Sequence, residues 1–180
     1  NELQTQYTDL ANLFPRLLGD NLPQELSRFG IFKIQGYTLL NGDNLTSDFV
    51  ANTKIGNANV KLNFTDLNNQ QKVRYQGDLS FDKVLLNKLL LEEKYGSVSF
   101  DLKINGKGFE RQYLDTELQG EISEIEINNN NYTNISVNGK LKEPQFNGDF
   151  KIEDPNMNME FTGLIDLDNA KNSYNFEAKI

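Results

Sequence analysis

Three residue types are missing from this chain. Cysteine, histidine and tryptophan are all absent from its 180 residues. Without cysteine there are no disulfides and no thiolate metal sites. Without histidine the chain lacks the commonest general base, the commonest zinc ligand and the usual partner of a nucleophilic serine. We therefore expect no metal, no cofactor and no catalytic residues, and we predict that the protein is not an enzyme.

Basic residues are also scarce. The chain has 18 Lys and Arg against 26 Asp and Glu, for a formal net charge of −8, and no basic cluster. A protein of this charge binds phosphate backbones poorly, so nucleic acid is not an expected partner. Anionic membrane surfaces are disfavoured for the same reason.

Long apolar runs are missing as well. No stretch approaches the 18 consecutive apolar residues of a membrane-spanning helix. The first residues, NELQTQY, have neither the basic start nor the apolar core of a signal peptide. Because the sequence opens without methionine and within a pattern, we interpret it as a segment of a longer protein.

What the chain does contain is a repeated phrase: apolar, any residue, glycine, any residue, apolar. It occurs at 75–79, 118–122, 137–141, 146–150 and 161–165. Side chains alternate between faces along a strand, so the glycine and both apolar residues share one face. A glycine at such a position leaves space beside large side chains or lets the strand bend. The repetition favours an elongated β structure.

Period-two alternation runs from residue 31 to the end and predicts a mainly β protein. The candidate strands are 31–38, 45–55, 58–65, 72–82, 97–105, 113–119, 121–128, 132–141, 145–153, 158–167 and 173–180. Short turns rich in Asn, Gly and Asp separate them, which predicts an antiparallel meander with one wet and one dry face. The run VLLNKLLL at 84–91 does not alternate and predicts a short helix or an irregular crossing. Such a long sheet could close as a barrel, fold over as a sandwich, or remain open as a curled sheet with a hydrophobic trough.

The first 30 residues follow a different pattern. One apolar stripe at helical spacing comprises Leu3, Tyr7, Leu10, Phe14 and Leu17. Pro23 then suits the first position of a short second helix over 24–28, which Gly30 ends. We expect residues 1–30 to form a helical segment that either packs on the sheet of residues 31–180 as core or plugs an open trough.

The ordered motifs of the second half are similar to those of a known family. The stretches YTNISVNGKL (132–141), FNGDFKIEDPN (146–156) and MEFTGLIDL (159–167), together with Leu22-Pro23, Phe29-Gly30 and Gly36-Tyr37 upstream, carry the similarity. They resemble the TamB proteins of the Bacteroidetes type, which are translocation and assembly modules related to the AsmA group. The resemblance covers about residue 20 to the end.

The resemblance implies a fold, a place and a function. It implies a β-taco, a long bent sheet with a hydrophobic trough, in a periplasmic segment of an inner-membrane-anchored protein of a Gram-negative bacterium. The implied partners are phospholipid acyl chains or outer-membrane protein clients, and an outer-membrane partner of the barrel-assembly type. The implied function is phospholipid carriage between the two membranes, or assistance in outer-membrane protein assembly and secretion.

The inward apolar residues are the candidate lining of such a groove. They are Phe49, Val60, Leu62, Phe64, Tyr75, Phe81, Phe100, Val137, Phe146, Phe150, Met159, Phe161 and Phe176. Two alternatives remain open: the same residues fill an ordinary β-sandwich core, or the chain is a closed-core structural or adhesive β module without lipid cargo. The acidic residues Glu121, Glu124 and Glu126 are interpreted as a solvated strand face, because two of them alternate with Ile122 at outward positions.

Overall fold

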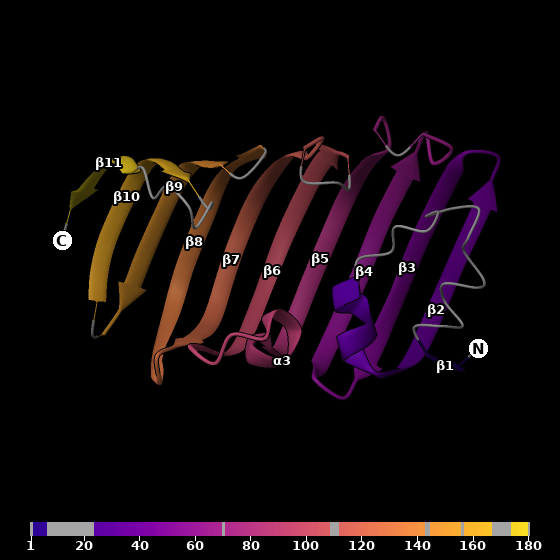
Figure 1. Ribbon diagram of the computed structural model, residues 1–180, viewed down its shortest axis with the longest axis horizontal. Coiled ribbons are helices and arrows are strands. Elements are labelled where there is room, and N and C mark those ends of the chain that lie inside the picture. Colours follow the sequence, from indigo (N-terminus) through magenta and orange to yellow (C-terminus); the bar gives the residue numbers. More distant parts are fainter. Residues whose placement is uncertain are drawn as a thin grey trace.

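The computed structural model describes residues 2–6, 24–69, 71–108, 112–142, 145–155, 157–166 and 174–179. They form one antiparallel sheet of eleven strands whose spatial order follows the sequence order, so the predicted meander is confirmed (Figure 1). The strands are β1 (Glu2–Gln6), β2 (Ile31–Asn41), β3 (Asn44–Thr53), β4 (Gly56–Thr65), β5 (Arg74–Leu85), β6 (Tyr95–Lys107), β7 (Asp115–Ile127), β8 (Asn130–Lys142), β9 (Gln145–Asp154), β10 (Met157–Asp166) and β11 (Tyr174–Lys179).

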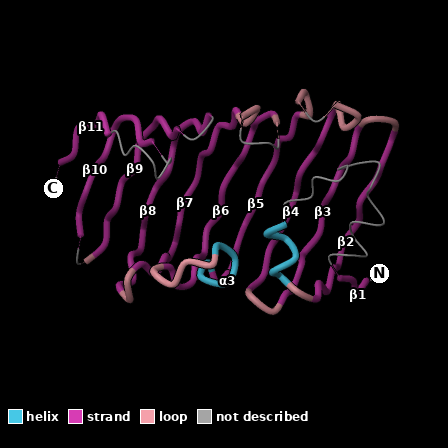
Figure 2. The backbone as a smooth tube through the Cα atoms, in the orientation of Figure 1, coloured by secondary structure: helices cyan, strands magenta, loops and turns pink. Residues whose placement is uncertain are grey.

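The sheet is a single open layer. Its outermost strands, β1 and β11, lie at opposite ends, so it is not closed as a barrel (Figure 2). The described residues contain no second sheet, so the sandwich alternative is not what forms. The two helical elements, the 3-10 helix η1 (Gln24–Phe29) and the helix α3 (Leu86–Leu90), lie on the same side of the sheet.

The predicted N-terminal helix is wrong for residues 2–6, the part of it that the structure describes. Glu2–Gln6, which contains Leu3, is a strand paired antiparallel with β2. The open edge of β2 offers backbone hydrogen bonds that a helix start at this position would not receive, and this pairing overrides the local apolar spacing. Tyr7, Leu10, Phe14 and Leu17 lie outside the described residues.

The second predicted helix is confirmed as η1, and Gly30, with φ +73°, follows it. The apolar run 84–91 is confirmed as a short helix, α3, although its first two residues still belong to β5. The prediction of two strands at 113–119 and 121–128 is wrong, because both belong to β7. Gly120 adopts φ +154° and continues the ladder instead of turning the chain.

Tight turns and bulges keep the register. Asn128 and Asn129 have φ of +52° and +61° and join β7 to β8, as two-residue hairpin turns of the primed type require. In β5 an irregularity between Phe81 and Val84, with Lys83 at φ +50°, keeps both apolar residues on the same face. The Lys83 amide donates to Ser99 Oγ at 3.0 Å, which fastens the bulge to β6.

Candidate functional site

Register places the candidate lining residues in rows that cross the sheet on one face. In the first row, directly paired positions are apolar on nine consecutive strands: Ile34, Ala51, Ala58, Phe81, Phe100, Ile122, Ile135, Ile152 and Met159. The second row is Gly36, Phe49, Val60, Leu79, Leu102, Gly120, Val137, Phe150 and Phe161. Each row therefore offers a continuous apolar path along the sheet.

Two further rows complete this surface, which we call the apolar face. The third runs through Leu62, Gly77, Ile104, Leu118, Gly139, Gly148 and Gly163 to the register position of Phe176. The fourth runs through Leu45, Phe64, Tyr75, Gly106, Thr116, Leu141 and Phe146. Every residue proposed for the groove from the sequence holds a position in one of these four rows.

The groove residues selected from the sequence leave out several members of the same rows. Ile34, Leu79, Leu102, Ile104, Leu118, Ile122, Ile135, Leu141 and Ile152 share the apolar face. The signal was available, because each lies two positions from a candidate residue or glycine on its strand. Selecting mainly aromatic residues left these aliphatic residues out.

One part of the apolar face is covered. The Phe29 ring of η1 lies 5.9 Å from that of Phe32 and 6.3 Å from that of Phe81. Leu86 and Leu89 of α3 pack against the same cluster, in which Val84 is 0% exposed. The Arg28 guanidinium donates a hydrogen bond to the Leu89 carbonyl and joins the two helical elements. This corner is a conventional packed core.

Strands β7 to β9 carry another cluster without such a cover. Ile135, Val137 and Phe146 are buried by Phe150, Ile152 and other residues of neighbouring strands. Within the described ranges, no helix residue belongs to this cluster. Phe150 of this cluster keeps intermediate exposure, as does Phe100, which packs against the covered cluster. Side chains shield one another here within a single layer.

One buried polar pair interrupts the fourth row. The Tyr75 hydroxyl lies 2.5 Å from Thr116 Oγ1, directly above Gly106, and donates to the Gly108 carbonyl at 3.3 Å. Burial, partly offset by the Thr116 hydrogen bond and reinforced by the charge of Asp115, raises the pKa of Tyr75. The phenol therefore stays neutral, and it closes this end of the apolar face with satisfied hydrogen bonds.

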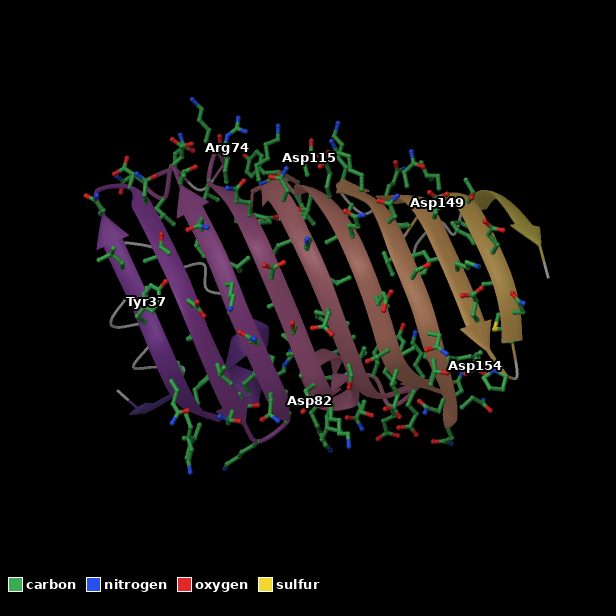
Figure 3. The ribbon with its side chains drawn as sticks, turned by 180° about the vertical axis from the view of Figure 1, so that it is seen from behind. Tyr37, Arg74, Asp82, Asp115, Asp149 and Asp154 are labelled. Atoms are coloured by element: carbon green, nitrogen blue, oxygen red, sulfur yellow. The ribbon has the colours of Figure 1, made fainter. Side chains whose placement is uncertain are left out.

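The opposite, outer face is polar, as Figure 3 shows from behind, with Tyr37 and Asp149 among its side chains. Ion pairs cross it, such as Lys61 with Asp48 at 3.9 Å and Lys140 with Asp115 at 2.7 Å. The Lys140 hydrogen bond, opposed by partial burial, holds the pKa of Asp115 below its ordinary value.

A depression of about 530 Å³ also lies on the outer face, not on the apolar one. Its lining is Asn59, Lys61, Asp78, Ser80, Asp101, Leu102, Lys103, Gln119 and Gly120. The two lysines and two aspartates balance in charge, and this wide hollow has no aromatic wall. Glu121 is exposed on the same face, and Glu124 accepts a hydrogen bond from Asn131 at 2.8 Å. Among the described residues no cluster of acidic side chains could hold a metal ion.

Comparison with known proteins adds no assignment. No family model, curated protein or solved structure matches the chain. In the described part of the chain, no helix has both the length and the apolar character needed to cross a bilayer. The apolar face is therefore the candidate site, on the strength of its geometry alone.

Proposed function

We propose that this chain is a periplasmic segment of a TamB-like cell-envelope protein that carries phospholipid between the inner and outer membranes. In this proposal the acyl chains lie against the apolar face, and the parent chain is anchored in the inner membrane. An outer-membrane partner of the barrel-assembly type receives the cargo.

One observation supports this proposal above the others: apolar positions follow one another on nine neighbouring strands with no second sheet over them in the described residues. Burial of an acyl chain gains about 0.8 kcal/mol per CH₂, so a long chain could gain on the order of 10 kcal/mol. Rows without charged side chains offer no fixed anchor, which suits a cargo that must slide.

Assistance to outer-membrane proteins is a second candidate, favoured by the open edges. Strands β1 and β11 each pair on one side only, so a client segment could add to the sheet by β-augmentation. A closed-core adhesive module is less well supported. Such a module needs a second layer, and η1 and α3 supply one only around Val84 and Val98 in the described residues.

The proposal is tested by cross-linking in cells. A photoreactive residue replaces Phe100 on the apolar face, and in the control strain it replaces Asp101, its neighbour on the outer face. We expect phospholipid adducts at position 100 and none at 101. Equal labelling at both positions, or none at either, contradicts lipid carriage, whereas protein adducts at the edge strands alone favour client assembly.

A further inference from the structure

The third row loses its side chains where it crosses β8, β9 and β10. Gly139, Gly148 and Gly163 are direct partners in the register. A Cβ added at Gly148 would lie 2.4 Å from the Cα of Gly139, so the backbones form a bare floor. Three strands make this floor roughly 14 Å long in the direction of the sheet axis. We call it the glycine slot.

Two apolar walls flank the glycine slot. Val137, Phe150 and Phe161 of the second row form one wall, and Leu141 and Phe146 of the fourth row stand on the other side. Val137, Phe146 and Phe161 are each at most 6% exposed. The slot is one residue wide, because the rows on both sides of it keep their side chains.

Two phenyl rings occupy the slot. Phe146 and Phe150 lie two residues on either side of Gly148, so their Cα atoms are roughly 13 Å apart in an extended strand. Their ring centroids are nevertheless only 5.0 Å apart. Both rings must therefore lean toward each other over Gly148. Phe146 also reaches across to β8, because its Cζ would lie 2.5 Å from a Cβ at Gly139.

The charged residues beside the slot lie on the other face. Lys140, Asp149 and Glu160 alternate with the slot residues and are exposed. The walls and floor thus contain no charged side chain, and no hydroxyl or amide side chain either. An occupant must be uncharged and apolar along the roughly 14 Å of the slot, and narrow enough for a single row.

We propose that the glycine slot is a subsite for one unbranched acyl chain, and that Phe146 and Phe150 are its gate. This inference rests on the proposed function. Without ligand the two rings fill the slot, and they rotate away from it when an acyl chain enters. A phospholipid head group stays outside the slot, because nothing in the slot pairs with its charge. Methyl branches are excluded by the two walls.

A binding experiment with the purified chain tests the gate, using palmitate and the methyl-branched phytanate as probes. Phe146→Ala and Phe150→Ala each remove one ring, and the control Tyr37→Ala removes an exposed ring from the outer face. We expect the two gate variants to bind palmitate about tenfold more tightly than the native chain, since a ring pair is worth about that factor. The Tyr37→Ala control should bind palmitate as tightly as the native chain does, and palmitate should be preferred over phytanate throughout.

Two controls keep the outcomes separate. Phe146→Leu and Phe150→Leu retain apolar bulk and replace the alanine variants if those fail to fold, with the same direction expected. If the rings only shield the glycines, as aromatic side chains do in other sheets, the gate variants lose stability and bind no better than the control, which overturns the gate. If the gate variants bind no better but phospholipid still labels position 100, the slot is rejected and the proposed function is retained. No palmitate binding by any variant and no labelling at position 100 reject the proposed function itself.

Discussion

At the scale of single residues, the Tyr75–Thr116 pair is the most exacting feature of the apolar face. Both groups are buried, at 8% and 5% exposure, and they satisfy each other at 2.5 Å. Tyr75→Phe removes the phenolic oxygen and leaves the Thr116 hydroxyl without this partner. We expect the free energy of unfolding, measured in urea, to fall by roughly 1–2 kcal/mol. The matched control is Tyr37→Phe on the outer face, where Tyr37 is 58% exposed and no change is expected.

The same pair predicts a dependence on pH. Burial raises the pKa of Tyr75 above its ordinary value of 10.0, so above that pH the folded chain keeps a proton that the unfolded chain releases. The stability contribution of this group is therefore complete below pH 10 and is lost as the pH rises through the folded pKa. In urea titrations across this range, the native chain should lose stability more steeply than Tyr75→Phe. Parallel declines would show that the phenol titrates in the folded chain as it does in the unfolded chain.

At the scale of elements, η1 and α3 are too short to be stable alone, so packing must hold them in place. The Arg28 hydrogen bond to the Leu89 carbonyl ties one to the other, and Leu86 and Leu89 anchor α3 on the sheet. Arg28→Ala should loosen α3 and leave the sheet intact. We expect amide hydrogen exchange of Leu86–Leu90 to accelerate about tenfold while exchange in β5 and β6 stays unchanged.

The control for this experiment is Lys88→Ala, because Lys88 is exposed on the same helix. It should leave the exchange of α3 near its native rate. If Arg28→Ala accelerates exchange in β5 and β6 as much as in α3, the helical cover and the sheet open as one unit, and the separate-cover interpretation is wrong.

The strands were largely predictable from the sequence, and the exceptions have physical causes. Alternation alone located β3, β4, β6, β8 and β9, because each has one wet and one dry face. The β1 strand was not predictable, because its pairing depends on the edge of β2, which local spacing does not reveal. Gly120 was interpreted as a break, whereas an extended backbone with positive φ lets it continue β7. The sequence does not distinguish a glycine that ends a strand from one that continues it.

The candidate site was predictable as a shared face but not in its shape. Period two places Phe146, Gly148 and Phe150 together, and register confirms it. The sequence suggested that such glycines leave open room, yet the two rings lean over Gly148 and fill that room. Ring orientation depends on what the neighbouring strands leave bare, and that follows from register between strands rather than from any one segment.

At the scale of the whole molecule, the decisive property is that, among the described residues, nothing covers part of the apolar face of this single-layered sheet. Such a face tolerates a charge that a packed interior does not. Phe150 has intermediate exposure in β9, whereas Val84 is 0% exposed beneath η1 and α3. These two positions distinguish an open face from a filled core within the same chain.

Phe150→Asp should therefore leave the sheet folded, with roughly 1–2 kcal/mol lost in urea unfolding, while phospholipid labelling at position 100 disappears. Val84→Asp buries a carboxylate without a partner and should cost on the order of 3 kcal/mol or more, enough to unfold much of the chain. Circular dichroism and urea titration of the two variants measure the contrast. Equal unfolding by both substitutions would mean that the side chains over β9 are packed as tightly as those around Val84. The sheet would then have no open surface on which lipid could be carried. A folded Phe150→Asp that still labels lipid would instead place the cargo elsewhere along the rows, because the charge would then lie outside its path.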